Sequence, residues 1–394
     1  MYIGYEAQGR QKIGRPESRR EWLERMVAAA VVLPAANFVP AFANSTFGKS
    51  QKTKWSMPGL FPGRVISVRN PRAMVDGRYQ SEPIAEMIRR GMVELTGAPD
   101  STAAWRSFFE PGEIVGIKLN PSSVPYVISA PEVVQEIIKG LEAAGVRRKD
   151  IVIYDRYKDM FFRAGFDKWV PDGVRSSWAT DYVDKVQQNM RGYDPDHWMD
   201  MQLTLPGFTF DDERARRSYA ALFITREVDK LVNLCILKHH QSAGITFALK
   251  NMSHGLVNNV NRSHSSPMLN ACGAFIPTSV SIPVIRNKTV LHIGDSVQAL
   301  YHGGPILKKE ATKFLWEPKR IYFSTDPVAL DKLGWEELDR KRAASGMKPL
   351  AEAPEDEFSG FVHMQPEHVD IAGALGLGIA DRDKIKFREI DLGG

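Results

Sequence analysis

Short apolar segments alternate with amphipathic helical segments along most of this chain, and this alternation constrains its fold more than any other feature. The clearest unit is a strand expected at 113–117, a helix expected at 130–144 and a second strand expected at 150–154. A helix between two such strands is typical of a parallel crossover connection. At the start of this helix, Ser129 fits an N-cap and Glu132 completes a capping box.

The same rhythm continues on both sides of this unit. The other expected strands are 64–69, 230–237, 289–293 and 320–324, and the other expected helices are 82–95, 246–256 and 327–342. Together they predict an α/β fold with a mostly parallel sheet covered by helices. We therefore expect a single α/β domain over residues 64–394, preceded by a polar linker at 44–63.

The alternation is interrupted at about 156–219, where aromatic residues are frequent and no period is visible. A long insertion between sheet elements often forms a lid over the strand ends. The alternative is a subdomain that packs a small core of its own. The sequence leaves both interpretations open.

The first 43 residues have the three parts of an export signal. Arg19 and Arg20 precede an apolar stretch at 26–39, and Ala41-Phe42-Ala43 supplies the small residues of a cleavage site. The arginine pair is similar to a twin-arginine signal. The apolar stretch is shorter than the roughly 20 residues of a membrane span. We expect export by the twin-arginine translocase, cleavage after Ala43, and a periplasmic or otherwise exported protein without stable membrane insertion after cleavage.

Charge and cysteine content exclude several functions. The net charge of +5 is mild and the basic residues are dispersed, so nucleic acid is not an expected partner. The chain has only Cys235 and Cys272, which are too few for a disulfide framework or a four-cysteine iron–sulfur cluster. Cys235 lies in an apolar segment, where we expect a buried thiol. A disulfide between the two cysteines stays open.

Charged or polar residues occur at the ends of five expected strands. In chain order they are Lys118 and Asn120, then Asp155, then Lys238, His239 and His240, then Asp295, and finally Asp326. Ligands of open α/β sheets bind outside the carboxyl ends of the strands, so we expect one shared site there. Asp326 also fits a second role, because an Asp before Pro327 is typical of a helix N-cap.

The densest signal is the segment 237–251, in which a strand runs through a glycine-containing loop into a helix. A helix N-terminus favours anions. Thr246, Lys250 and His254 are spaced four residues apart and share one helix face, with Asn251 beside them. We expect Lys238, His239 and Lys250 to be catalytic, and the side chains expected to bind an anionic substrate are Lys118, Asn120, Thr246 and Asn251. The alternative for Lys250 and His254 is an ordinary solvated helix face.

Six of the nine histidines lie between His239 and His302. Imidazole and carboxylate groups together suit a divalent first-row metal. The candidate ligands are Asp155, His239, Asp295 and Asp326, although no recognised metal-binding spacing is present. A divalent metal is therefore an open alternative for the cofactor, and an iron–sulfur cluster is not expected.

At these motifs the chain resembles the domain-of-unknown-function 362 family. The residues that carry the resemblance are Ile117-Lys118-Leu119-Asn120, Leu237-Lys238-His239, Gly244-Ile245-Thr246, Ala248-Leu249-Lys250-Asn251, Asp295 and Ser324 to Asp331. The resemblance spans about 64–378 and implies the α/β fold and the motif positions more than a reaction. Many members pair this domain with a cysteine-rich ferredoxin-like segment, which is not seen here, so an electron-transfer role is in doubt.

The sequence thus favours an exported enzyme that binds an anionic small molecule at the carboxyl edge of its sheet, with metal assistance left open. One alternative is a non-catalytic periplasmic binding protein or cofactor carrier with the same pocket. Another is a structural partner of a redox complex, with the aromatic segment as its docking surface.

Overall fold

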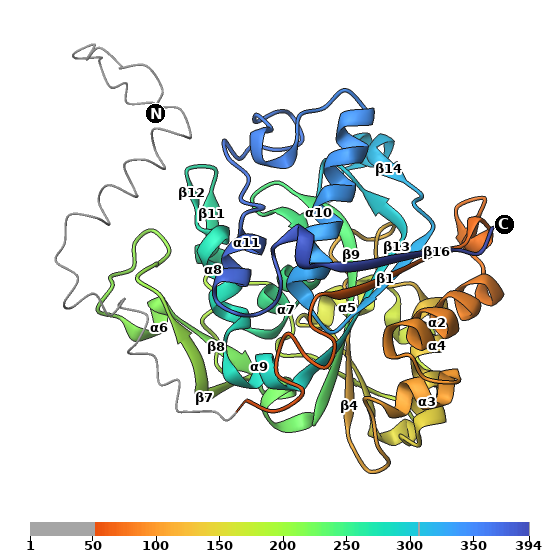
Figure 1. Ribbon diagram of the computed structural model, residues 1–394. Coiled ribbons are helices and arrows are strands. Elements are labelled where there is room, and N and C mark those ends of the chain that lie inside the picture. Colours follow the sequence, from red (N-terminus) through yellow and green to blue (C-terminus); the bar gives the residue numbers. More distant parts are fainter. Residues whose placement is uncertain (1–51, 306–307, 394) are drawn as a thin grey trace, which may run out of the picture. The chain divides into compact units, whose positions relative to one another are not determined.

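The computed structural model describes residues 52–305 and 308–393. The expected export signal and the first part of the expected linker, 44–51, lie outside these residues. The described residues belong to one compact unit built on a large mixed sheet (Figure 1). The strand order is β16 (Lys386–Asp391), β1 (Arg64–Arg69), β15 (Arg320–Ser324), β13 (Thr289–Leu300), β9 (Lys230–His240), β4 (Val115–Lys118), β5 (Ile151–Tyr154) and β6 (Arg175–Ser177).

The sheet is mostly parallel, so the α/β fold expected from the sequence is confirmed. Strands β13, β9, β4, β5 and β6 run in one direction, and β16 is parallel to β1. Strand β15, however, is antiparallel to both β13 and β1. Its carboxyl end therefore lies at the edge where the parallel strands begin, so the expectation that all five strand ends converge is wrong for β15.

Two short strands extend the sheet near the carboxyl ends of β9 and β13. Strand β10 (Gly244–Thr246) folds back against the end of β9, and β14 (Leu315–Trp316) pairs with the end of β13. Strand β13 is also longer than expected and continues through Gly294, Asp295 and Ser296. Those three residues are consequently inside the sheet rather than at a strand exit.

Helices α2 (Ser81–Thr96), α3 (Ser101–Arg106) and α4 (Pro131–Ala144) cover one face of the sheet (Figure 1). Their apolar sides are buried against the sheet, and each fully buried aliphatic side chain contributes roughly 1.5–3 kcal/mol. Gly91 lets α2 approach the ring of Phe323 in β15, and Gly140 lets α4 approach the Trp105 indole. In both places a Cβ atom would overlap the ring.

The start of α4 differs from the expected capping box. The N-cap is Ala130, whose methyl group cannot accept a hydrogen bond, and Pro131 begins the helix. Ser129 instead uses its hydroxyl oxygen to accept a hydrogen bond from the Asn120 backbone N–H, at 2.8 Å. The capping-box prediction is therefore wrong, because the Ser129 hydroxyl bonds to the loop after β4 and not to the start of α4. The expected end of this helix at residue 144 is confirmed, and Gly145 follows it as the C-cap.

The opposite face is covered by α7 (Ala248–Leu256), α8 (Cys272–Val280), α10 (Pro327–Ala344) and α11 (His368–Ala374). Helix α9 (Pro283–Lys288) leads into β13. Two small antiparallel pairs, β2 (Met74–Val75) with β3 (Arg78–Tyr79) and β11 (His264–Ser266) with β12 (Leu269–Asn270), lie outside the main sheet. No helix in the described ranges is long and apolar enough to cross a membrane.

The aromatic insertion has features of both interpretations. It contains α5 (Lys158–Arg163), the sheet strand β6, α6 (Glu213–Arg216) and the antiparallel pair β7 (Tyr193–Asp200) and β8 (Arg217–Ala221). A cluster of rings forms its own packing, made by Phe161, Phe162, Phe166, Trp169 and Trp178. Other insertion residues, described next, line a cavity.

Candidate functional site

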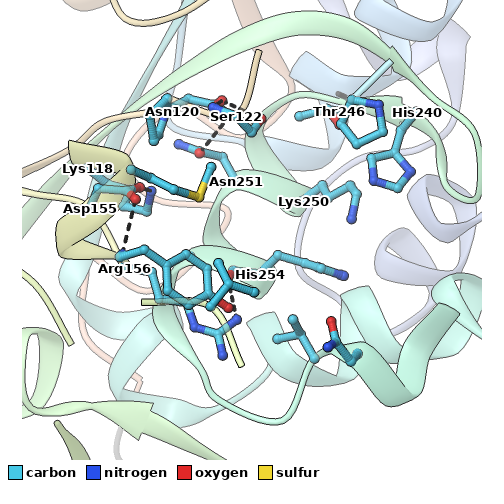
Figure 2. Close-up of a pocket in the computed structure, with 18 of the residues that line it drawn as sticks. Lys118, Asn120, Ser122, Asp155, Arg156, His240, Thr246, Lys250, Asn251 and His254 are labelled. Carbon is cyan, nitrogen blue, oxygen red and sulfur yellow. Dashed lines mark hydrogen bonds and ion pairs between the residues drawn. The ribbon is translucent and has the colours of Figure 1, made fainter. Parts of the chain in front are cut away.

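A cavity of about 220 Å³ lies beyond the carboxyl ends of β4, β5 and β9 (Figure 2). Its walls come from three parts of the chain: the ends of these strands, helix α7 with the loop after it, and the aromatic insertion. The charged and polar lining residues are Lys118, Asn120, Ser122, Asp155, Arg156, Tyr157, Gln187, His240, Thr246, Lys250, Asn251, His254, Asn261 and His264. The insertion therefore does cover the strand ends.

Lys118 and Asp155 form a buried ion pair on one wall. The Lys118 Nζ donates to Asp155 Oδ1 at 2.6 Å and to the Leu119 carbonyl at 2.5 Å. The other carboxylate oxygen accepts from the Tyr157 N–H at 3.2 Å. Gly255 of α7 leaves room for this pair, because a Cβ there would lie 2.2 Å from Lys118 Cε. Both charges are thus compensated without a ligand.

Lys238 is fully buried behind the wall and does not line the cavity. Its Nζ donates to Asn120 Oδ1, to the hydroxyls of Ser122 and Ser123, and to the Val127 carbonyl, at 2.8–3.3 Å. None of these acceptors is a carboxylate, and burial, assisted by the charge of Lys118, lowers the pKa of Lys238 to about 7. Lys238 therefore fixes the loop that follows β4.

Asn120 connects the loop after β4 to α7 through a chain of hydrogen bonds. Its amide nitrogen donates to Asn251 Oδ1 at 3.1 Å, and the Asn251 amide nitrogen donates to Asn233 Oδ1 at 2.7 Å. The two expected substrate-binding amides are brought together in this way at the cavity wall. Their hydrogen-bonding groups are largely used within the protein.

Lys250 is the exception among the buried lysines. It lies on α7 and points toward the cavity, with a relative exposure of 5%. Its ammonium group makes no hydrogen bond or ion pair within the part of the chain that the structure describes. Burial lowers the pKa of Lys250 to about 8. The alternative of a solvated helix face is therefore wrong, because α7 is buried on nearly all sides.

Arg156, which the sequence analysis did not single out, adds a second cation without a counter-ion. Its guanidinium donates to the Tyr193 hydroxyl, the His254 carbonyl and Gln187 Oε1, at 2.9–3.2 Å, and all three acceptors are uncharged. Among the described residues, the cavity lining thus holds three cations and a single carboxylate, Asp155, which Lys118 neutralises. The only sequence signal for Arg156 was its place directly after Asp155.

The three histidines of the lining are neutral at physiological pH. Burial lowers the pKa of His240 and of His254 well below the usual value, and lowers that of His264 to about 3. The His240 Nδ1 accepts from two backbone N–H groups at 3.2 and 3.3 Å, those of Ser242 and Ala243. Its Nε2 is then the nitrogen that carries the hydrogen, which makes this ring a neutral donor.

Thr246 lies in β10, just before α7, and not in the helix as expected. It still lines the cavity together with Lys250, Asn251 and His254. Its hydroxyl oxygen is buried and has no hydrogen-bond partner in the described ranges. An unpartnered buried hydroxyl costs free energy, so this group is well placed to meet a ligand.

The structure does not bring together the four residues expected to bind a metal. Asp155 is held by Lys118, and His239 accepts from the Gly304 N–H at 3.1 Å, outside the cavity lining. Asp295 accepts from the Tyr79 hydroxyl at 3.2 Å. Asp326 caps α10 by accepting from the N–H groups of Val328 and Ala329. The N-cap interpretation of Asp326 is confirmed.

A different group could hold a metal ion. One ligand atom each of His254, His264 and Cys272 lie within 4.8 Å of one another. Cys272 and Cys235 are both free, so they are not joined in a disulfide, and Cys235 is a buried thiol whose pKa burial raises, as expected. His264 and Cys272 were missed because they come from β11 and α8, whose packing against α7 has no local sequence signal.

These features define an α/β protein with a cationic cavity at the carboxyl ends of its parallel strands. The chain belongs to the domain of unknown function family DUF362, whose match covers residues 115–336 and so includes every cation of the cavity. No curated protein matches the chain.

Among solved structures, the chain is similar to a Thermotoga maritima protein from the Northeast Structural Genomics Consortium, with 12% sequence identity and a TM-score of 0.40. The alignment covers 69% of this chain and 60% of that one.

Proposed function

We propose that this chain is an exported enzyme whose cavity binds a small organic anion, with Lys250 as the central contact. The observation that carries the proposal is the buried Lys250 ammonium, which has no partner in the described ranges. A buried cation without a counter-ion is costly, and a bound carboxylate or phosphate would offset that cost.

The other groups of the cavity fit the same ligand. Arg156 supplies a second uncompensated cation, and the Thr246 hydroxyl and the His240 N–H supply neutral donors. The cavity of about 220 Å³ is below the usual range for drug-sized ligands, roughly 300–1,000 Å³. This size favours a ligand such as a short carboxylic acid or a small phosphate compound.

Lys250 also suits proton transfer. A general acid or base works best when its pKa lies near the operating pH, and the pKa of Lys250 is about 8. Lys238 and His239, which the sequence marked as catalytic, do not line the cavity. We assign Lys238 a positioning role through Asn120 and leave the chemistry to Lys250.

Binding is tested with two probes, inorganic phosphate and succinate, by isothermal titration calorimetry. Lys250→Met should weaken binding by roughly 10- to 150-fold, the worth of a charge-assisted hydrogen bond of about 1.5–3 kcal/mol. The matched control is Lys230→Met, since Lys230 is also buried but is paired with Glu113 at 2.6 Å, away from the cavity. Equal affinities in wild type and Lys250→Met would overturn the proposal.

Catalysis is tested on the small anions that bind. Wild-type protein is incubated with each compound, and conversion is followed by proton NMR. Lys250→Arg should bind but not convert, because an arginine keeps the charge and holds its proton. If every bound compound is recovered unchanged, the chain is a binding or carrier protein, the alternative that the sequence left open.

Export by the twin-arginine route is a separate part of the proposal, supported by Arg19, Arg20 and the apolar stretch after them. Replacing both arginines by lysine should leave the precursor in the cytoplasm. Cell fractionation followed by mass measurement of the mature chain provides the readout. Undiminished export of the Lys-Lys variant would refute this route.

A further inference from the structure

The imidazole and thiol cluster at one side of the cavity offers a second kind of chemistry. His254 and His264 line the cavity, and Cys272 lies directly behind them as the first residue of α8. Their nearest ligand atoms are all within 4.8 Å of one another. Three converging nitrogen and sulfur ligands are the number that catalytic zinc sites use.

The two histidines are held in the same way. Each follows a serine, and each Nδ1 contacts the hydroxyl of that serine, at 2.9 Å for Ser253 with His254 and 2.7 Å for Ser263 with His264. Each serine hydroxyl also donates to a backbone carbonyl three residues earlier, that of Lys250 at 3.3 Å or of Val260 at 2.7 Å.

The contact with Ser263 sets the tautomer of His264. A serine hydroxyl has one hydrogen, and when it donates to a carbonyl the oxygen can only accept from the imidazole. The His264 Nδ1 then carries the hydrogen, which leaves the His264 Nε2 with a free lone pair. The Ser263 hydroxyl also lies 3.2 Å from His254 Nε2, and a metal ion bound to that nitrogen would replace this contact. A metal-bound histidine normally donates its other N–H to just such a partner.

We propose that one imidazole nitrogen each of His254 and His264, together with the Cys272 thiolate, binds a divalent transition metal of the zinc type. Two imidazoles and one thiolate suit Zn²⁺ and its spectroscopic substitute Co²⁺. The fourth position faces the cavity, because the two histidines line it and the cysteine does not. Binding converts the Cys272 thiol to a thiolate and releases its proton to solvent.

The proposal goes beyond anion binding and does not depend on it. Lys250 is close enough to Cys272 for their charges to interact, so its ammonium group disfavours a cation at the cluster. Removing that charge should weaken anion binding and strengthen metal binding. Lys250→Met therefore separates the two proposals, since each moves in the opposite direction.

The test uses the purified full chain after removal of metals by a chelator, titrated with Zn²⁺ or Co²⁺ alone. We expect one metal per chain, proton release in the calorimeter, and a thiolate-to-cobalt charge-transfer absorption. Cys272→Ser should abolish this absorption. Cys235→Ser is the matched control, since Cys235 is the only other cysteine and is equally buried, and it should keep the absorption.

Ser253→Ala tests the support of the metal ligands, because it removes the hydroxyl that contacts His254 Nδ1 while leaving all three ligands. Zinc affinity should fall by about 10- to 100-fold. In Lys250→Met the zinc affinity should rise. The proposal is overturned if the wild type binds no stoichiometric metal, or if the cobalt spectrum is unchanged in Cys272→Ser, which would mean an adventitious ion only.

Discussion

Asp326 and Lys250 are both buried charges, yet their surroundings differ. Asp326 lies where the antiparallel strand β15 ends, and its carboxylate accepts four backbone N–H bonds, from Gly63, Val328, Ala329 and Ile379, at 2.9–3.0 Å. The Lys250 ammonium, beyond the ends of the parallel strands, makes no hydrogen bond or ion pair in the described ranges. A satisfied buried charge joins segments of the fold, whereas an unsatisfied one marks a place for a ligand.

The largest effect on stability is expected from removing the Asp326 carboxylate, whose hydrogen bonds are all made within the protein. Asp326→Ala leaves four backbone donors without their acceptor, and we expect the free energy of unfolding to fall by about 3–5 kcal/mol. Asp326→Asn keeps one acceptor oxygen and should lose less. Urea unfolding followed by circular dichroism measures both. A loss below about 1 kcal/mol in Asp326→Ala would remove the contrast between the two ends.

For Lys250, the buried charge without a partner in the described ranges, we expect a change in stability of the opposite sign. Lys250→Met removes a buried charge whose pKa is lowered from 10.5 to about 8, so the free energy of unfolding at pH 7 should rise, by on the order of 3 kcal/mol at most. Leu249→Ala, at the neighbouring buried position, should instead lower it by about 2–5 kcal/mol. If Lys250→Met lowered the free energy of unfolding as much as Leu249→Ala does, Lys250 would have a structural role.

The pH dependence sharpens the same point. Because the folded pKa of Lys250 is below the unfolded value, the unfolded chain binds more protons between pH 8 and 10.5, and the stability of the wild type should rise with pH in that window. Succinate stays fully ionised there, so its affinity should fall about tenfold per pH unit above 8 as the ammonium is lost. In Lys250→Arg, affinity measured by calorimetry should stay flat up to pH 10.

The smallest effect should come from Thr246→Val, which removes the unpartnered hydroxyl at nearly constant volume. Without ligand, the change in unfolding free energy should be within about 1 kcal/mol and could be stabilising, since no hydrogen bond is lost. Succinate affinity should nevertheless decrease. Undiminished affinity in this variant would show that the hydroxyl does not contact the anion.

The sequence predicted the elements of the fold better than their directions. The strands 64–69 and 320–324 match β1 and β15 to the residue, because their apolar runs are bounded by clear breaks. The direction of β15 was missed. A parallel pair needs a crossover, and the sequence offered no long helix between the expected strands at 289–293 and 320–324, so its absence was the available signal.

The candidate site was predictable in part for a similar reason. Lys118, Asn120, Lys250 and Asn251 meet at the cavity wall because they follow or face parallel strands, which is a local and repeated pattern. Cys272, His264 and Arg156 reach the same place through loops and the insertion, which obey no period. Lys238 was rightly located near the site, but its direction into the loop after β4 depends on four acceptors that only the folded chain assembles.

Gly255 determines how closely α7 can approach β4. The helix carries Lys250, Asn251 and His254, and it can rest on Lys118 only because position 255 has no side chain. A methyl group there would overlap the end of the Lys118 side chain, so either the Lys118 ammonium would leave Asp155 or the helix would move outward together with its cavity residues. Gly255 therefore sets how closely α7 packs against Lys118. Mutational scanning should find that this position is among those of the chain that tolerate substitution least.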